Sequence, residues 1–366
     1  MMAINRRSFL AKTGLLISSI TIGFMPANAV ELPSFASAFT DFKDHHYVGL
    51  FSPLGKLIKS HKVPSRGHAA TFSKDGRYAV FFARRPGNWM LVIEVMTGKV
   101  FTKVAITPGR HFYGHGVFSH DQSLLFVTEN DYENARGVIG VYDVTQGFKR
   151  VRELLSYGVG PHELALLSDG QTLVVANGGI ETHPEYGRIK LNIETMSPRL
   201  TYIDSRSGDE LSHVLPPHHK LSLRHLTLND NDEVIVGAQF QGGGEEDLPL
   251  IFRHKQGETL RALSGQPLMK RRQLNSYIAS VTFSSDGQLV VSSSPRGDRV
   301  SLWDANSGWL RDINVSDVGG VAQTPSSNHL LLSSGNGQLY LLSLSDHELK
   351  ALPRHSHRWD NHLVAI

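Results

Sequence analysis

Five histidines stand at equivalent places in a repeating β pattern, each near the start of the strand that opens a repeat. They are His68 in Arg66-Gly67-His68, His115 in Tyr113-Gly114-His115, His162 in Gly160-Pro161-His162-Glu163, His225 in Leu223-Arg224-His225 and His362 in Trp359-Asp360-Asn361-His362. Neutral imidazole is the commonest metal ligand in proteins and suits iron, copper and zinc. If the five strand starts converge on one axis, the sequence predicts a transition-metal site, with iron, copper or zinc as candidates.

Polar neighbours of these histidines extend the predicted site. Glu163 and Asp360 adjoin histidines in the sequence and are candidates to orient imidazole rings or to bind the metal directly. Asn361 is a further supporting residue, and Arg66 and Arg224 bring positive charge. Cations beside a metal are unfavourable unless an anion is present. The arginines therefore favour an anionic ligand, or a metal held in an anionic complex.

A structural role for the histidines is the alternative. They could satisfy backbone groups between repeats or line a water-filled channel. Two equivalent strand starts carry no histidine, namely Tyr277-Ile278-Ala279-Ser280 and Val318-Gly319-Gly320. The predicted ring of ligands is therefore occupied at five of seven positions.

The strands that carry the histidines belong to a sevenfold repeat. One recurring unit is an apolar run that ends in a Gly-containing turn, as in Leu302-Trp303-Asp304 to Gly308. A second unit, upstream of most of these, contains an Asp-Gly hairpin turn, as in Phe72-Ser73-Lys74-Asp75-Gly76. Together they make four antiparallel strands per repeat, which is typical of propeller blades. We therefore predict an all-β, seven-bladed β-propeller.

The two ends of the chain predict how the ring closes. The C-terminus supplies one strand, His362 to Ile366, and the N-terminus supplies about three strands within Ser34 to Val63. Each end is an incomplete blade, but together they make four strands. We expect the C-terminal strand to join the N-terminal strands, which removes the open edge of the sheet.

Residues 1–29 have the pattern of an export signal. Arg6, Arg7 and Lys12 precede an apolar run that is too short to span a membrane, and Ala27-Asn28-Ala29 fits a cleavage site. The paired arginines resemble the twin-arginine export motif; a general secretory signal and an uncleaved anchor are the alternatives. We expect a signal peptide at 1–29, one propeller domain at 30–366, and a periplasmic protein with no stable membrane span after cleavage.

The charge balance and the missing cysteines exclude several classes of function. The chain has 37 Lys and Arg against 34 Asp and Glu, and three of the Lys and Arg lie in residues 1–29, so 34 positive residues remain against 34 negative ones. A formally neutral body does not favour nucleic-acid binding. The absence of cysteine excludes disulfides, thiolate zinc sites, iron–sulfur clusters and cysteine-attached haem. We expect a monomer.

Several phrases resemble one protein family. They are Arg66-Gly67-His68, Gly114-His115-Gly116-Val117-Phe118-Ser119, Thr128-Glu129-Asn130-Asp131, Gly137 to Asp143, Gly160-Pro161-His162-Glu163-Leu164, Val175 to Ile180, Thr182-His183-Pro184, Arg224-His225-Leu226 and Asp360-Asn361-His362. The resemblance is to the bacterial domain-of-unknown-function family numbered 1513, exported seven-bladed propellers often encoded beside imelysin-like, iron-regulated periplasmic proteins. It implies iron as the metal and periplasmic iron-uptake proteins as partners.

Three functions stay open at this point. The first is a metal-binding propeller that serves iron uptake or handling. The second is an enzyme (a lyase, hydrolase or oxidoreductase) at the same channel mouth, with His as general base and Arg stabilising an anion. No Gly-x-Ser-x-Gly or His-Glu-x-x-His motif occurs in the sequence to support a standard mechanism. The third is a scaffold that binds another exported protein.

Overall fold

The computed structural model describes residues 32–243 and 246–366. Residues Leu32–Ile366 form one compact unit. The predicted signal peptide at 1–29 lies outside the described residues. Within them, no helix has the length and apolar character that crossing a membrane requires.

Twenty-eight strands of the described residues form seven antiparallel four-stranded sheets, the blades. Blade 1 consists of β4 (Gly67–Phe72), β5 (Tyr78–Ala83), β6 (Trp89–Glu94) and β7 (Val100–Ala105). Blade 2 consists of β8 (Arg110–Phe118), β9 (Leu124–Asp131), β10 (Arg136–Asp143) and β11 (Lys149–Leu155). Blade 3 consists of β12 (Pro161–Leu166), β13 (Thr172–Asn177), β14 (Arg199–Asp204) and β15 (Glu210–Val214). Blade 4 consists of β16 (Leu221–Leu228), β17 (Val234–Phe240), β18 (Ile251–His254) and β19 (Arg261–Ala262). Blade 5 consists of β20 (Ser280–Phe283), β21 (Leu289–Ser294), β22 (Arg299–Asp304) and β23 (Gly308–Asn314). Blade 6 consists of β24 (Val318–Gln323), β25 (His329–Ser334), β26 (Leu339–Ser343) and β27 (Leu349–Ala351). Blade 7 is β28 (His357–Ala365), β1 (Phe35–Asp41), β2 (His46–Phe51) and β3 (Leu57–Val63).

Helical turns are short and lie between strands. The α-helix α2 (Leu268–Arg272) precedes β20, and the 3₁₀ turn η4 (Pro295–Gly297) follows β21. Two more 3₁₀ turns, η2 (Pro184–Tyr186) and η3 (Ile193–Thr195), lie in the long connection between β13 and β14. The prediction of an all-β, seven-bladed propeller is confirmed.

The hydrophobic core consists of layers between neighbouring blades. Strand β5 is buried along its whole length, because another blade covers each of its faces. Tyr78 and Val80 pack into the cluster that contains Phe112 of blade 2, whereas Phe81 packs into the cluster that contains Val48 of blade 7. The outer strand β7 instead alternates between exposed and partly buried residues. This pattern leaves the first strand of each blade at the centre of the ring.

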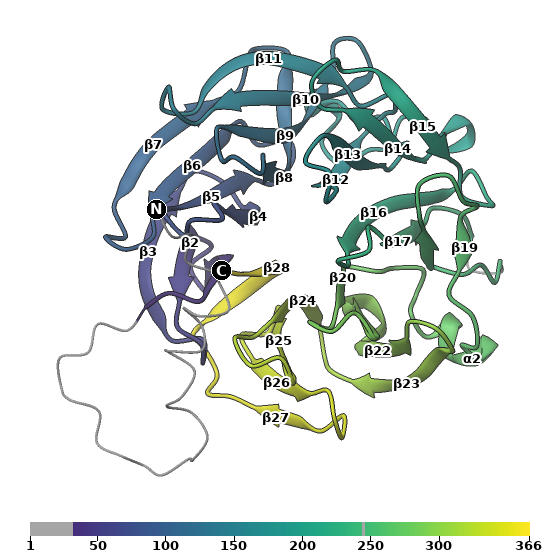
Figure 1. The fold of residues 1–366 in the computed structure, drawn as a ribbon. Helices are drawn as coiled ribbons and strands as arrows, with labels where there is room; N and C mark the ends of the chain where they lie inside the picture. Colours follow the sequence, from purple (N-terminus) through teal and green to yellow (C-terminus); the bar gives the residue numbers. More distant parts are fainter. Residues whose placement is uncertain (1–31, 244–245) are drawn as a thin grey trace, which may run out of the picture. The chain divides into compact units, whose positions relative to one another are not determined.

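The ring closes through the C-terminal strand, as predicted. β28 pairs antiparallel with β1, with Ala365 opposite Phe35 and Arg358 opposite Thr40. The buried Ser37 hydroxyl of β1 donates a 2.6 Å hydrogen bond to the carbonyl of His362. β28 also contacts the inner strands β24 and β4 on either side, so the inner strands form a continuous circle (Figure 1). The strand begins at His357, five residues earlier than the sequence pattern indicates.

Deletion of the last seven residues, 360–366, should unfold the protein. The deletion removes most of the strand that pairs with β1 and opens the ring. The thermal unfolding transition followed by circular dichroism should be lost. A truncated form that keeps the melting temperature of the full chain would contradict the role of β28 in closure.

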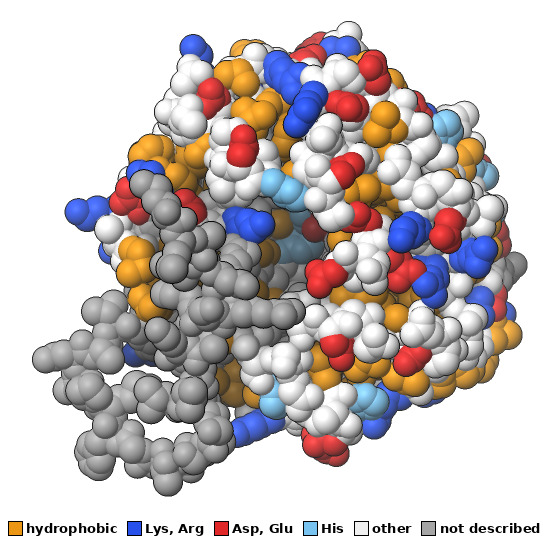
Figure 2. Space-filling view, viewed as in Figure 1, with side chains coloured by type: hydrophobic (Ala, Val, Ile, Leu, Met, Phe, Trp, Pro, Cys, Tyr) orange, Lys and Arg blue, Asp and Glu red, His pale blue; other side chains and the backbone are white. Residues whose placement is uncertain are grey.

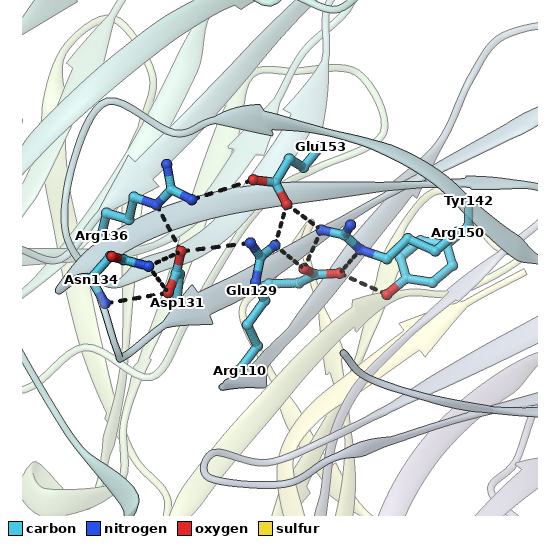
Figure 3. Close-up of polar contacts among 8 residues, drawn as sticks. All are labelled: Arg110, Glu129, Asp131, Asn134, Arg136, Tyr142, Arg150 and Glu153. Atoms are coloured by element: carbon cyan, nitrogen blue, oxygen red, sulfur yellow. Dashed lines mark hydrogen bonds and ion pairs between the residues drawn. The ribbon is translucent and has the colours of Figure 1, made fainter. Parts of the chain in front are cut away.

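Blade 2 contains a charge-balanced network that joins all four of its strands (Figure 3). Glu129 is fully buried, accepts a 2.6 Å hydrogen bond from the Tyr142 hydroxyl, and lies 2.9 Å from an Nη atom of Arg150. Arg110 contacts Glu129 and also Glu153 of the outer strand. The network balances three arginines against three carboxylates, listed in full as Arg110, Arg136, Arg150, Glu129, Asp131 and Glu153. Since every charge has a partner, we assign the network a structural role. It explains the Thr128–Asp131 phrase of the sequence.

Glu129→Ala should destabilise the fold strongly. The change leaves Arg150 and the Tyr142 hydroxyl without their buried partner, and breaking a buried ion pair costs about 3–5 kcal/mol. Urea unfolding at neutral pH measures the loss. Glu133→Ala is the matched control, because Glu133 is exposed on the turn that follows the same strand. Equal stabilities of the two variants would show that the network contributes little.

Candidate metal centre

The five histidines lie at β-bulges of the inner strands. The register between an inner strand and its neighbour shifts at His68 of β4, His115 of β8, His162 of β12, His225 of β16 and His362 of β28. A bulge breaks the strict alternation of side chains along a strand, and near functional sites it often changes the direction in which one side chain points. Strand β24 has a bulge at Gly319-Gly320 and no histidine, and β20 pairs without a shift. The two positions without histidine are thus the two that the sequence indicated.

Gly114 shows how closely the bulges approach one another. Its φ of 102° lies in the region that favours glycine, and a Cβ placed on it would lie 2.4 Å from Cδ2 of His68. The backbone of the β8 bulge therefore packs directly on the ring from β4. Position 114 therefore requires glycine for two reasons: the positive φ, and the lack of room for a Cβ atom beside the His68 ring.

The five imidazole rings form one compact cluster. The centroid of the His68 ring lies 4.4 Å from that of His362, 5.0 Å from that of His115 and 5.4 Å from that of His162. The centroids of the His225 ring and the His162 ring lie 4.5 Å apart. All five side chains are buried. In Figure 2, histidine side chains lie at the central hollow of the face in view, where charges of both signs surround them.

Four of these rings carry a buried nitrogen without a hydrogen-bond partner in the described structure. The atoms are Nδ1 of His68 and His162, and Nε2 of His115 and His362. Buried polar atoms are normally satisfied, so each exception asks for an explanation. A bound ion or ligand at the cluster would supply the missing partner for several of them at once.

Glu163 connects two of the histidines. One of its carboxylate oxygens lies 3.3 Å from Nδ1 of His115, and the other lies 3.1 Å from Nδ1 of His225 and accepts the Leu226 N–H at 3.0 Å. An ionised Glu163 fixes Nδ1–H on both rings, so their Nε2 atoms keep a lone pair. The sequence placed Glu163 beside His162, but the carboxylate serves the histidines of blades 2 and 4. Glu163 thus orients rings of the cluster, as the sequence analysis offered, but from its own blade it reaches the histidines on either side.

Asp360 is held mainly by arginines. Arg66 donates two hydrogen bonds to one oxygen, at 2.7 and 3.0 Å, and Arg84 lies 3.4 Å from the other oxygen. Nδ1 of His68 lies 3.7 Å from Asp360. Asp360 therefore adjoins His68 rather than its sequence neighbour His362. The arrangement occupies Arg66, which the sequence offered as an anion-binding residue, with a carboxylate of the protein itself.

The remaining predicted residues lie at the edge of the cluster. Asn361 lines pockets on both sides of the bulge in β28, one of them shared with His68 and His225. Arg224 lines that same pocket and is buried. The structure therefore brings the predicted histidines and their neighbours together. His68 and His162 lie near the start of their strands, as expected, whereas His115, His225 and His362 lie in the middle of theirs, because β8, β16 and β28 begin earlier than the sequence pattern indicates.

Burial lowers the pKa of four of the histidines and so keeps them neutral. It lowers the pKa of His68 to about 3 and the pKa of His162 and His362 well below the usual range, and it also lowers the pKa of His225. Burial alone would raise the pKa of Glu163, but His115 and His225 hold it below its ordinary value. The cluster thus offers neutral imidazoles beside an ionised carboxylate, which is the form that binds metal ions.

The ligand atoms form overlapping triads rather than one five-ligand site. In the described residues the triads are His68 with His115 and His362, His68 with His162 and His225, and Glu163 with His115 and His225; the ligand atoms of each lie within 4.8 Å of one another. His68, His115 and His225 each belong to two of the three, and His68 is in both triads that consist of histidines alone. Ligand atoms about 2.1 Å from a shared ion are at most ~4.2 Å apart, so small side-chain rotations complete a triad.

A cationic pocket adjoins the cluster, and sequence reasoning missed most of it. Its volume is about 360 Å³, and His68, His162 and His225 form part of its wall. The other walls carry six cationic side chains: Arg84, Arg85, Arg188, Lys190, Arg224 and Arg296. Only Arg224 was among the predicted residues. The rest come from the connections between the second and third strands of blades 1, 3 and 5, which the sequence analysis did not compare.

A family model described as a protein of unknown function (DUF1513) matches residues 61–366. The chain belongs to this family. The DUF1513 match includes every strand that carries one of the five histidines, and it confirms the resemblance seen in the sequence. The family description assigns no activity, so the chemistry has to be argued from the site.

A solved structure supports the fold. The hydrazine synthase of Kuenenia stuttgartiensis has a TM-score of 0.61 at 14% sequence identity, covering 91% of this chain and 99% of that one. At that identity the similarity bears on the propeller architecture alone. No curated protein matches the DUF1513 chain.

Gly114→Ala should destabilise the protein more than Gly76→Ala. Both glycines have positive φ, so both substitutions strain the backbone. Only at Gly114 does the new methyl group collide with the His68 ring; a Cβ at Gly76 meets open space. Unfolding free energies from urea titration measure the difference. Equal losses would show that the bulge tolerates a moved ring.

Neutral burial of the histidines should make stability depend on pH between 7 and 5. An unfolded histidine takes up a proton below about pH 6.5, whereas His162 stays neutral in the fold because burial lowers its pKa. Stability is therefore full above pH 6.5 and falls as the pH drops, by about 1.4 kcal/mol per pH unit for each such histidine. Urea unfolding of metal-free protein at pH 7 and pH 5 measures the slope.

His162→Gln should reduce that slope, because one buried neutral histidine is removed. His120→Gln is the control, since His120 is exposed on the β8–β9 turn. A His162→Gln slope equal to that of the unmodified protein would show that His162 is charged in the fold.

Proposed function

We propose that this protein is a periplasmic metal-binding propeller that holds a transition metal at the histidine cluster of its central channel. The observation that carries the proposal is the set of four unpartnered ring nitrogens within a buried cluster of five imidazoles. An uncharged cluster of lone pairs is costly to bury without a partner, and a metal ion would satisfy several of them at once.

The ligand chemistry favours iron, copper or zinc. Imidazole suits all three, and the cluster has no thiolate that would select a soft metal, because the chain lacks cysteine. Glu163 supplies a negative charge beside His115 and His225, and it would orient both rings or bind the ion itself. The family resemblance favours iron and a role in iron uptake. Export by the twin-arginine route and iron-uptake partners belong to this proposal.

An enzyme at the same place is the second candidate. Each triad offers three protein ligands, the number that catalytic metal sites use while keeping a position open for water or substrate. The adjoining pocket gives that position room. The reaction would then belong to metal-assisted chemistry, a hydrolase, lyase or oxidoreductase class, with Glu163 placed to hold a proton.

Metal loading tests the proposal directly. Protein purified without a histidine tag and stripped on a chelating resin should take up about one Fe(II), Cu(II) or Zn(II) per chain and gain thermal stability. His68→Gln should reduce the uptake strongly, because His68 belongs to both of the triads that consist of histidines alone. His120→Gln should bind as the unmodified protein does. Uptake that is far below one metal per chain, without a thermal shift, would refute the proposal.

A further inference from the structure

The pocket beside the histidine cluster has an unbalanced charge. Its walls come from six blades, and four of these carry the six cationic side chains named above; no Asp or Glu is among the lining residues that the structure describes. Two carboxylates lie behind the wall: Asp360 contacts Arg84 and is already paired with Arg66, and Glu163 contacts His225. The charge of the pocket is therefore strongly positive, in a chain whose described body is otherwise mixed in sign.

Arg224 is the decisive residue. It is 5% exposed, and no carboxylate in the described structure forms an ion pair with it. Its Nε atom is buried without a hydrogen-bond partner. Burial, together with the nearby Arg85, lowers its pKa to about 10, so the guanidinium is still charged at neutral pH. A buried, unpaired charge is strongly destabilising, and proteins retain one where something else neutralises it.

Of the other cations, Arg84 contacts Asp360, whereas Arg85, Arg188, Lys190 and Arg296 form no ion pair with a carboxylate of the described residues. Lys190 donates a hydrogen bond to the neutral side chain of Gln241, and Arg296 stacks over the ring of Tyr277 at 4.5 Å. Burial and the surrounding arginines lower the pKa of Lys190. Arg188 and Lys190 come from the long connection between β13 and β14, which places them at the exposed rim of the pocket. The connection thus adds charge to a pocket that the inner strands already make positive.

We infer that this arginine pocket binds a small organic anion that carries two or more carboxylate or phosphate groups. Guanidinium groups bind the oxygens of such groups in pairs, and several positive charges call for a ligand with more than one negative charge. The volume of about 360 Å³ limits the ligand to a small molecule. A buried Arg224 excludes recognition through surface charge alone.

Anion binding by the arginine pocket is separate from metal binding by the histidines and does not depend on it. The arginines would need an anion whether or not the histidines hold a metal. If a metal is present, an oxygen of the anion would lie beside it, because three of the five histidines line the same pocket. The proposed ligand class would then be either a chelator that accompanies the metal or a substrate presented to it.

Calorimetric titration of metal-depleted protein tests the inference. The metal is removed on a chelating resin and the buffer is free of phosphate, because a soluble chelator or phosphate would itself be a multiply charged anion. Citrate and fructose 1,6-bisphosphate represent the carboxylate and phosphate sources, and acetate and glycerol are the controls. We expect at least one of the two polyanions to bind saturably, with an affinity that falls as salt is added, and neither control to bind. Absence of saturable binding by both polyanions would overturn the inference.

Arg224→Met separates a built site from general attraction. The variant should weaken polyanion binding at least about tenfold. Arg311→Met removes the same charge from the exposed face of β23 and should leave the affinity unchanged. Without ligand, Arg224→Met should melt at a temperature equal to or above that of the unmodified protein, since it removes a buried charge that has no partner. A lower melting temperature in a variant that still binds the polyanion would show that Arg224 has a structural role, and would overturn the inference.

The two variants distinguish failure of the metal proposal from failure of the anion proposal. Arg224→Met should keep its metal uptake, and His68→Gln should keep a binding isotherm for the polyanion in metal-free protein. Failure of the metal test alone leaves the anion pocket intact, and failure of the anion test alone leaves the metal proposal intact.

Discussion

The pairing of β28 with β1 is the contact on which the rest of the structure depends. It joins residues more than 300 positions apart in the chain and converts seven separate sheets into a ring. The same strand carries His362 into the cluster and Asp360 to Arg66, so the closure of the fold and the completion of the site are one event. A propeller with an open seam would retain the other four histidines but lose the geometry that holds them at one axis.

The sequence predicted the architecture and the histidines for the same reason. Blade repeats place equivalent residues at equivalent positions, so a chemical feature at the first strand of several blades was visible as a spacing. The bulges were not visible, because a bulge depends on the register between two strands and not on the composition of one. Gly114 beside His115 is a signal for such a bulge in retrospect, since its positive φ and the His68 ring leave no room for a side chain.

The partners of the site residues were harder to predict. Glu163 and Asp360 were correctly placed near the cluster, but each contacts histidines other than its sequence neighbour. Arg85, Arg188 and Arg296 reach the pocket from loops of different blades. All three loops join the second and third strands of their blades, but the loops differ in length and sequence, and the blade pattern alone does not show that they meet at one pocket. Arg66 shows the opposite error, because a cation that looked available to a ligand is held by Asp360.

The long separation of β1 and β28 in the sequence also has a consequence for the time course of synthesis. β1 is made early, and its partner emerges only after more than 300 further residues, on the order of tens of seconds later at ordinary translation rates. During that interval β1, β2 and β3 form a sheet whose inner edge has no partner, and an unpaired edge can recruit strands from other chains. The strand that completes the binding site therefore also ends the period in which the nascent protein is most exposed to misassembly.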